Sequence, residues 1–454
     1  MFFLLFFTPF FLPSAGNING LFFLAASWIF YASFGAYYLL LLLFLIATDF
    51  YLALAIHKTA RPLKKRAILL LSIVVNTGAL LFFKYADFFI KIFNNALPFV
   101  NVPLLNIALP VGLSFYTFQG ISYLVDVYRG DVLPETSLKY FALYKSAFPQ
   151  LVAGPIERAA HLLPQLEKEF VAAAVPYKEA LLLVIVGLIK KVVVADNLAV
   201  VANKIYASYG SFDASTLVLA TVFFGFQIYC DFSGYVDIAR GLGKLVGIDF
   251  VVNFDRPYFS ASIAEFWRRW HISLSSWVRD YIYIPLGGNR KGALRQYANL
   301  VATMAVMGFW HGASWTFLIW GIYNGLLLVF NKIFQGIALA AAVPKLIKVG
   351  MTFSLVNIGW IFFRSPSIAQ AVGILEKIAS FRFSEHIQYQ PGMLLGLYLI
   401  FFLVAGEYLE GRFRIKGRLL RASSFFFSII TVMLLSILAF WGVQESLSFI
   451  YFQF

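Results

Sequence analysis

The chain's five histidines are the residues best suited to proton transfer, and His311 stands apart from the others. It lies within Met307–Phe317, between two apolar helical runs. An ionisable group at membrane depth indicates a functional site, and desolvation lowers the pKa of such a histidine and favours its neutral form. A neutral imidazole can take a proton from a hydroxyl, as acyl transfer to an alcohol requires. The alternative is a packed histidine bonded to a backbone carbonyl between helices.

The remaining histidines fit simpler roles. His57 lies in a basic loop, His161 follows a Pro-Ile-Glu-Arg segment, and His386 lies in a polar stretch. We interpret these three as solvated side chains, as exposed polar residues usually are. His271 is the second candidate for chemistry, although its local sequence alone favours an ordinary residue on the polar face of a helix.

The segment around His271 has the pattern of an amphipathic helix. Ser262 and Glu265 fit a capping box, which opens a helix. Large apolar residues then recur at helical spacing, at Phe266, Trp270, Leu274, Trp277 and Tyr281. Polar residues form another face, at Arg268, His271, Ser275 and Arg279. The sequence therefore predicts one helix that lies at the membrane interface or on the cytoplasmic side of the protein.

A second polar group falls within an apolar run. Asp231, Ser233 and Asp237 lie close together there, and carboxylates in such a place need a partner or water. Arg240 follows Asp237 at a spacing that lets the two meet on one helix face. We therefore expect a structural ion pair rather than acid–base catalysis.

Other chemistries are excluded by residue type. The sequence has no Gly-x-Ser-x-Gly elbow, no phosphate-binding Walker loop and no His-Glu-x-x-His zinc motif. Its one cysteine, Cys230, excludes an intramolecular disulfide and any site with several cysteine ligands. The histidines are too dispersed in sequence to suggest a metal site, and we expect neither a metal nor a bound cofactor.

The composition is that of a membrane protein. The 454 residues are 61% hydrophobic and 13% charged, with a mean hydropathy of +0.80, whereas soluble domains are about 25% charged. Long apolar runs predict about ten or eleven spanning helices in a single domain, residues 1–454. These runs are Leu21–Ile56, Ala67–Phe93, Leu104–Tyr128, Leu181–Val201, Leu217–Ile238, Tyr297–Phe330, Leu346–Phe363, Met393–Leu409 and Phe425–Trp441. Met1–Pro13 is apolar without a preceding positive charge, and we expect a retained membrane helix there.

The net charge of +14 is concentrated in loops. His57–Arg66 and Arg412–Arg421 are basic and should be cytoplasmic, whereas Asn94–Asn106 carries no Lys or Arg and should lie outside. This arrangement places both termini outside. The positive charge is explained by orientation and by contact with anionic lipid. We do not expect nucleic-acid binding, because there is no long basic run or soluble basic domain.

Phe148–Arg158 is apolar but is interrupted by two prolines and a glycine. These breaks free backbone groups that lipid cannot satisfy. A re-entrant or buried segment that lines a cavity and a simple loop at the membrane face are both compatible with this pattern.

Several of these segments together resemble the membrane-bound O-acyltransferase family, and in particular its branch of bacterial alginate O-acetyltransferases. The matching strings are Phe148–Ile156 (FPQLVAGPI), Tyr229–Ala239 (YCDFSGYVDIA), Phe266–Asn289 (FWRRWHISLSSWVRDYIYIPLGGN), Phe309–Trp315 (FWHGASW) and Phe449–Phe454 (FIYFQF). They occur in the order of the family and cover nearly the whole chain.

The resemblance implies an all-α fold in which a ring of spanning helices surrounds short inner helices and a central funnel or tunnel. It implies that His311 is catalytic and that His271 faces the same cavity. It further implies a thioester donor that enters from the cytoplasm, in this branch acetyl-CoA, and an acceptor reached from outside. The acyl group then passes to an extracytoplasmic acetyltransferase of the SGNH type, or directly to an exported polysaccharide such as alginate.

On this reading His311 acts as general base toward the acceptor hydroxyl, and His271 orients or polarises the thioester carbonyl. Phosphates of the donor would meet three arginines, although contacts with the helix or lipid explain these residues equally well: Arg268, Arg269 and Arg279. Other side chains would line the cavity, namely Gln119, Glu157, Asp231, Ser233, Trp310 and Ser314. The expected location is the bacterial cytoplasmic (inner) membrane.

Three other functions remain open on the sequence. The first, within the same family, is D-alanyl transfer from a carrier protein to teichoic acid. The second is a transporter or flippase for a lipid-linked glycan, which predicts repeat symmetry that the two halves do not show. The third is a non-catalytic scaffold.

Overall fold

The computed structural model describes residues 16–152, 154–168, 174–334, 343–380, 386–443 and 449–450. Within these ranges all regular secondary structure is helical, which confirms the predicted all-α class. The helix predicted at Met1–Pro13 lies outside the described residues. The described residues fall into two compact units: unit 1 contains Met1–Leu181 and Ala239–Val251, and unit 2 contains Leu182–Ile238 and Val252–Phe454.

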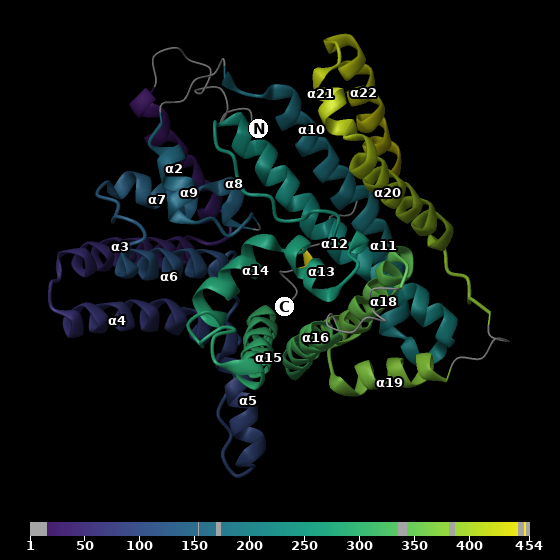
Figure 1. The fold of residues 1–454 in the computed structure, drawn as a ribbon, viewed down its shortest axis with the longest axis horizontal. Coiled ribbons are helices and arrows are strands. Elements are labelled where there is room, and N and C mark those ends of the chain that lie inside the picture. The colour runs from purple at the N-terminus through teal and green to yellow at the C-terminus, as the bar shows by residue number, and fades with distance from the viewer. Residues whose placement is uncertain are drawn as a thin grey trace. The chain divides into compact units, whose positions relative to one another are not determined.

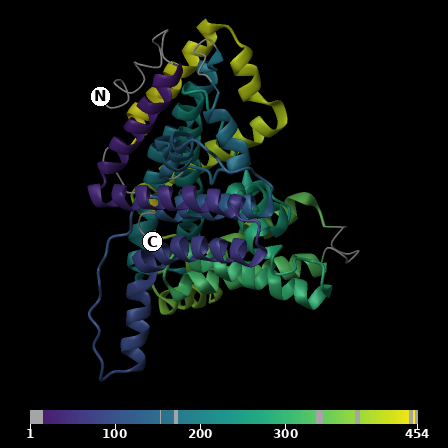
Figure 2. The same ribbon diagram turned by 90° about the vertical axis from the view of Figure 1, so that its left-hand side faces the viewer.

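Unit 1 is built from the first helices of the chain. Its elements are α2 (Gly16–Ala32), α3 (Ala36–Lys58), α4 (Pro62–Leu80), a π-helical turn (Leu81–Tyr85), α5 (Ala86–Ala96), α6 (Leu113–Arg129), α7 (Leu138–Ser146), α8 (Phe148–Leu151) and α9 (Ala159–Leu166). Helices α3, α4 and α6 pack against one another, as Figure 1 shows, and α7 packs against α2 and α3. Figure 2 shows α3 and α4 side by side.

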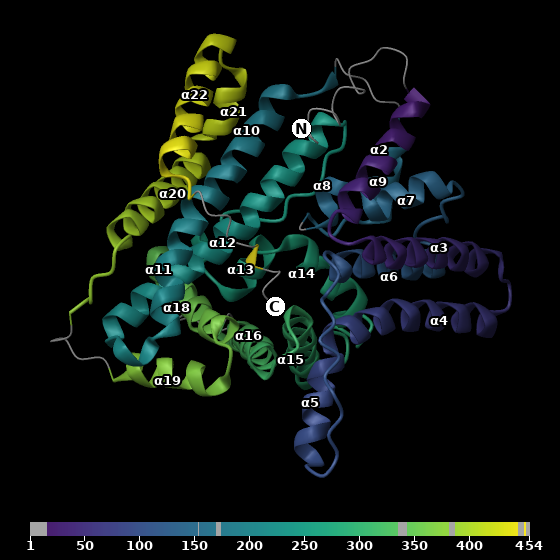
Figure 3. The same cartoon turned by 180° about the vertical axis from the view of Figure 1, so that it is seen from behind.

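Unit 2 holds most of the remaining helices, and α10 (Tyr177–Leu188) and α12 (Ala214–Leu245) contribute residues to both units. Its other elements are a π-helical segment (Ile189–Ala195), α11 (Asp196–Ala207), α13 (Ile263–Arg269), α14 (Ile272–Val278), a second π-helical turn (Arg279–Tyr283), α15 (Gly292–His311), α16 (Trp315–Phe334), α18 (Lys345–Arg364), α19 (Ile368–Ala379), α20 (Met393–Phe413), α21 (Ile415–Arg421) and α22 (Ser424–Trp441). Helices α15 and α16 form a tightly packed pair, visible in Figure 3, and α18 packs on α16.

Seven helices in the described ranges are long and apolar enough to cross a membrane. On α20 and α22 the large side chains Phe401, Phe402, Phe425 and Phe440 are exposed, as residues that face lipid should be. Several predicted runs are divided: the run Tyr297–Phe330 becomes α15 and α16. The number of spans, about ten or eleven, and the single domain stay predictions.

The segment with two prolines is buried rather than exposed at a surface. Phe148–Leu151 forms the short helix α8, and its four residues are buried, as are Pro155 and Glu157. Glu157 Oε1 accepts a hydrogen bond from the backbone N–H of Val251, 2.7 Å away. Burial favours the inner segment over the alternative of a loop at the membrane face.

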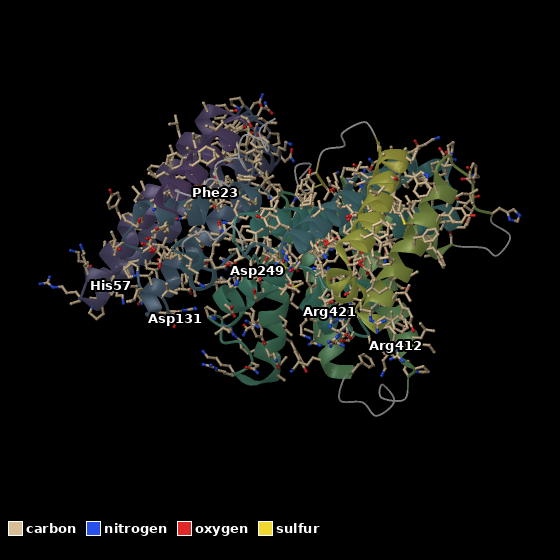
Figure 4. The ribbon with its side chains drawn as sticks, turned by 90° about the horizontal axis from the view of Figure 1, so that it is seen from above. Phe23, His57, Asp131, Asp249, Arg412 and Arg421 are labelled. Carbon is tan, nitrogen blue, oxygen red and sulfur yellow. The ribbon has the colours of Figure 1, made fainter. Side chains whose placement is uncertain are left out.

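The two basic stretches predicted as loops are largely helical: residues 62–66 open α4, and Ile415–Arg421 forms α21. His57 is exposed at the end of α3, and Arg412 and Arg421 lie near the ends of α20 and α21 (Figure 4). Clusters of Lys and Arg at helix ends are typical of the cytoplasmic side of membrane proteins. The orientation of the chain in the membrane remains a prediction.

Candidate active site

Close packing of α15 and α16 fixes the position of His311, which is the last residue of α15. A Cβ atom added to Gly308 would lie 2.3 Å from the backbone oxygen of Phe317, and one added to Gly321 would lie 2.3 Å from that of Met304. The two backbones therefore approach at a distance that only glycine permits. Gly312 follows in an extended conformation, and the chain turns into α16.

Aromatic rings surround the His311 imidazole, and the residue is 4% exposed. The ring centroids of Trp310, Trp320 and Phe363 lie 4.9, 5.2 and 5.3 Å from that of His311. All three contacts are edge-to-face, an arrangement in which aromatic pairs attract. Rings from α15, α16 and α18 thus hold the imidazole in place.

The neighbouring polar residues of this segment have structural roles. Ser314 Oγ accepts a hydrogen bond from the backbone N–H of Thr316 at 3.3 Å and lies 3.0 Å from its hydroxyl. Ser314 thus supports the first turn of α16, where backbone N–H groups lack helical partners. Trp310 is buried beside His311, as expected of a residue that lines a site, although the cavity itself stays a prediction.

The prediction of a single amphipathic helix from Ser262 to Tyr281 is wrong. The N-cap at its start is confirmed, because Ser262 Oγ accepts from the backbone N–H of Glu265 at 3.1 Å. The Glu265 carboxylate accepts from the N–H of Ala261, one residue before the cap, at 2.8 Å. However, α13 ends at Arg269, and His271 adopts a left-handed conformation with φ 43° before α14 begins. The periodicity of the side chains continues across this break, and so no local pattern predicts it.

An extended segment satisfies the backbone groups that the break leaves free. The N–H of Ile272 donates to the carbonyl oxygen of Asn253 at 2.9 Å, and the N–H of Asp255 donates to that of Arg269 at 3.0 Å. Trp270, 2% exposed, anchors the break in the core. A buried helix end needs such partners, and here they come from residues well before the helix.

His271 is 1% exposed and is not a surface residue of a polar helix face, which corrects the alternative drawn from the sequence. Its Nδ1 lies 3.3 Å from Asn253 Oδ1, and its ring contacts that of Phe232 at 4.7 Å. Burial lowers the pKa of the imidazole from 6.5 to about 3. His271 is therefore neutral over the physiological pH range.

A cluster of tryptophans in unit 2 joins the surroundings of the two histidines. Trp320, which contacts His311, stacks on Trp360 at 5.8 Å, and Trp360 lies 5.1 Å from Trp270, the neighbour of His271. The structure thus brings both candidate histidines to one aromatic cluster. Trp360 and Asn253 were not identified from the sequence, because neither belongs to a motif of reactive residues.

The carboxylates of α12 form ion pairs, as predicted for this segment, and Asp231 is buried whereas Asp237 is partly exposed. Asp231 lies 2.8 Å from Lys191 Nζ and also accepts from the backbone N–H of Ile450 at 2.7 Å. Asp237 lies 2.7 Å from Lys190 Nζ, a partner that the sequence did not indicate. Paired carboxylates of this kind hold helices together, and Ser233 is buried on the same helix.

The three arginines proposed for the donor phosphates are at least partly exposed. Arg269 pairs with Glu265 at 2.7 Å, one helical turn away, and Arg279 pairs with its neighbour Asp280 at 2.8 Å. Arg268 and Arg279 are exposed. These pairings fit the simpler reading of helix contacts, and a role in phosphate binding remains a prediction.

Two of the predicted cavity residues belong to unit 1. Glu157 is fully buried, and its Oε2 lies 2.7 Å from His161 Nδ1. Gln119 is buried in α6, and its backbone oxygen accepts from the hydroxyl of Tyr144 at 3.3 Å. His161 is therefore bound to a carboxylate rather than simply solvated, and the hydrogen bond with Glu157 raises its pKa above 6.5.

The family of the chain follows from comparisons with known proteins. The sequence model of the membrane-bound O-acyltransferase family matches residues 132–365, which include both His271 and His311. The chain is 40% identical over 392 residues to the probable alginate O-acetylase AlgI of Pseudomonas aeruginosa, a match that covers 84% of this chain and 74% of the relative.

Two further relatives carry other names. The peptidoglycan O-acetyltransferase of Helicobacter pylori is 37% identical over 380 residues, which cover 77% of this chain and 72% of the relative. The teichoic acid D-alanyltransferase of Streptococcus thermophilus is 31% identical over 241 residues, covering 49% of this chain and 56% of the relative.

Proposed function

Because this chain belongs to the membrane-bound O-acyltransferase family, we propose that it moves an acetyl group from acetyl-CoA to an exported polysaccharide such as alginate. The chain is a multi-pass membrane protein and an acyltransferase. The proposal adds the donor, the acceptor, the catalytic residue and a location in the bacterial cytoplasmic membrane.

The relatives support acetyl transfer over the alternative of D-alanyl transfer. Those named O-acetylase or O-acetyltransferase match over 77% to 89% of this chain. Those named teichoic acid D-alanyltransferase match over 49% and 50% of it. A transporter or a scaffold without catalysis has no comparable support.

The observation that carries the mechanism is the position of His311 at the end of α15, 4% exposed and among three aromatic rings. A neutral imidazole there can take the proton of an acceptor hydroxyl as the oxygen attacks the thioester carbonyl carbon. The C–O bond forms and the C–S bond breaks. The proton then passes to the departing thiolate, and the products are an ester and free coenzyme A.

The charge of the donor determines on which side of the membrane it would bind. Acetyl-CoA carries phosphates that cannot enter lipid, and so its nucleotide would stay at the cytoplasmic face near Arg268, Arg269 and Arg279. The acyl group would leave on the other side, directly to a polysaccharide or through an SGNH-type acetyltransferase. The first acceptor is then a hydroxyl in either case.

The test uses purified protein in proteoliposomes with acetyl-labelled acetyl-CoA and an alginate oligosaccharide. We expect labelled ester from the wild type and a rate about 10² to 10⁴ lower from His311→Ala, the usual range for removing a general base. Peptidoglycan fragments and a D-alanyl carrier protein serve as the competing acceptor and donor.

His386→Ala is the matched control, because His386 is an exposed histidine of the same unit. It should retain the wild-type rate. Equal rates for His311→Ala and wild type, at equal amounts of folded protein, would contradict the catalytic assignment. Transfer from the D-alanyl carrier alone would contradict the proposed donor.

A further inference from the structure

Asn253 presents a side-chain oxygen whose identity is fixed by its neighbours. Asn253 Oδ1 accepts from the backbone N–H of Ser273 at 3.0 Å and from the Ser273 hydroxyl at 2.9 Å. A backbone N–H can only donate, and so the atom that faces it must be the amide oxygen rather than the amide nitrogen. The orientation of the Asn253 amide is thereby determined, although oxygen and nitrogen are otherwise difficult to distinguish.

The same oxygen lies 3.3 Å from His271 Nδ1. Two acceptors facing each other would repel, and so Nδ1 must carry the proton of a neutral imidazole. Its other nitrogen, Nε2, then holds a lone pair. Within the part of the chain that the structure describes, this buried Nε2 has no hydrogen-bond partner.

The backbone reinforces this arrangement on both sides of the ring. Asn253 uses its carbonyl oxygen to bind the N–H of Ile272, immediately after His271, at 2.9 Å. The carbonyl of His271 accepts from the N–H of Ser275 at the same distance. A non-glycine residue with φ 43° persists only where its surroundings hold it, and such residues cluster at functional sites.

We propose that Asn253 is a positioning residue that holds His271 as its Nδ1–H tautomer, so that Nε2 accepts a hydrogen bond from the polar hydrogen of a substrate. This inference rests on the proposed function and deepens it. It also replaces the role expected from the sequence, because an Nε2 without a proton cannot polarise a thioester carbonyl by donation. The fitting group on the substrate is an O–H or N–H, such as the acceptor hydroxyl or an amide of the pantetheine arm.

The two histidines have different proposed roles because their surroundings differ. Because burial lowers the pKa of His271 to about 3, this residue is too weakly basic to keep a proton near neutral pH. It can therefore orient a donor group without removing its proton. His311 remains the proposed base.

The direct test is nitrogen NMR of protein labelled with ¹⁵N-histidine in lipid nanodiscs. The His271 signals are assigned by their loss in His271→Gln. We expect a protonated Nδ1 and an unprotonated Nε2 throughout the neutral pH range. A proton on Nε2, or a charged ring at neutral pH, would overturn the proposal.

Variants of Asn253 test whether the His271 tautomer affects the rate of turnover. Asn253→Ala removes the acceptor and should lower kcat about tenfold, the equivalent of one net hydrogen bond, while mixing the two tautomers. Asn253→Asp keeps an acceptor and adds a negative charge, which favours the imidazolium. It should therefore retain the Nδ1 proton and move the acid limb of the pH–rate profile to higher pH.

Asn299→Ala is the matched control, since Asn299 is also a buried asparagine and donates to the carbonyl oxygen of Gly288 at 3.0 Å. It should change neither the His271 signals nor the shape of the pH profile. If Asn253→Ala does not fold, Ser273→Ala removes one donor to the same oxygen and should show a smaller tautomer shift.

An unchanged His271 tautomer and pH profile in a folded Asn253→Ala protein would overturn the positioning role. The NMR result does not depend on the identity of the donor or acceptor. Failure of the proposed acetyl transfer and failure of this inference can therefore be told apart.

Discussion

The charge pair of Lys145 in unit 1 and the aromatic cluster around the two histidines in unit 2 bury ionisable side chains in different ways. In unit 1, Lys145 of α7 is ion-paired with Asp49 of α3, and both are fully buried. Asn76 of α4 donates to the same carboxylate at 2.6 Å. In unit 2, His271 and His311 lie instead among aromatic rings, and the partner of His271 is an uncharged amide.

The difference indicates that some buried polar side chains stabilise the fold, whereas others are available for chemistry. A buried charge pair stabilises the packing of its helices, because removing either partner leaves an uncompensated charge. Gly120 of α6 makes room for this pair, since a Cβ there would lie 2.2 Å from Asp49 Oδ2. A neutral imidazole needs no counter-charge and can still exchange or accept a hydrogen, which is what a reaction centre requires.

Breaking the charge pair should have the largest effect on stability. We expect Lys145→Ala to lower the free energy of unfolding by about 3–5 kcal/mol, because Asp49 would remain buried without its cation. Thermal unfolding in detergent and the amount of protein in membranes measure this effect.

The double variant Asp49→Leu/Lys145→Leu is the control, because it removes both charges together. It should recover much of the lost stability, since apolar replacements of a buried pair are often tolerated. A double variant as unstable as the single one would show that the pair is not the source of the effect.

Replacing His271 should affect turnover more than folding. In His271→Asn the left-handed backbone is tolerated, but the position of Nε2 is lost. We expect kcat to fall by about tenfold to a hundredfold, the cost of one buried hydrogen bond, with a smaller drop in melting temperature than in Lys145→Ala. If activity and the amount of folded protein fell equally, His271 would have a structural role like that of Lys145.

The glycine contact of α15 and α16 should respond to a single added methyl group. Gly308→Ala places a Cβ against the backbone of α16, where little can move, and should cost about 1–3 kcal/mol. Gly350→Ala on α18 is the control, because no atom lies within 4 Å of the Cβ it would add. The two melting temperatures should differ, and identical values would contradict the close packing that positions His311.

The pair of Glu157 and His161 should give the smallest effect, with a defined dependence on pH. His161 has a raised pKa because of its hydrogen bond to Glu157, and its side chain is 43% exposed, so that solvent screens the pair. Its stabilisation is fully present below pH 6.5 and is lost as the pH rises through the raised, folded-state pKa.

We therefore expect His161→Ala to lose less than about 1 kcal/mol in acid and nearly nothing in alkali. Unfolding curves of variant and wild type at two pH values measure the difference, with the exposed His386→Ala as control. A larger loss in alkali than in acid would contradict the sign of this argument.

The sequence predicted those parts of the molecule that depend on neighbours along the chain. Apolar runs predicted the all-α class, and the helix N-cap at Ser262 is confirmed. The position of His311 between two helices follows from the apolar runs on either side of it. Local pattern and local hydrogen bonding are sufficient for these features.

Features that depend on distant contacts were not predicted. The helix break at His271 is stabilised by Asn253, 18 residues earlier, and Lys145 meets Asp49 across 96 residues. No pattern near either residue signals its partner. The aromatic rings around His311 include Phe363. In the sequence Phe363 is part of an ordinary apolar run, and residue type alone does not show which face of a helix meets the site.

The most direct test of the account is a single-turnover measurement of acetyl transfer with equal amounts of folded wild type, His311→Ala and Asp49→Leu/Lys145→Leu. If the buried imidazole is catalytic and the buried charge pair is structural, the rate of acetyl transfer falls about 10²-fold or more in His311→Ala. In the double variant the rate stays close to that of the wild type. Transfer that survives without His311, or that is lost with the charge pair in folded protein, would contradict it.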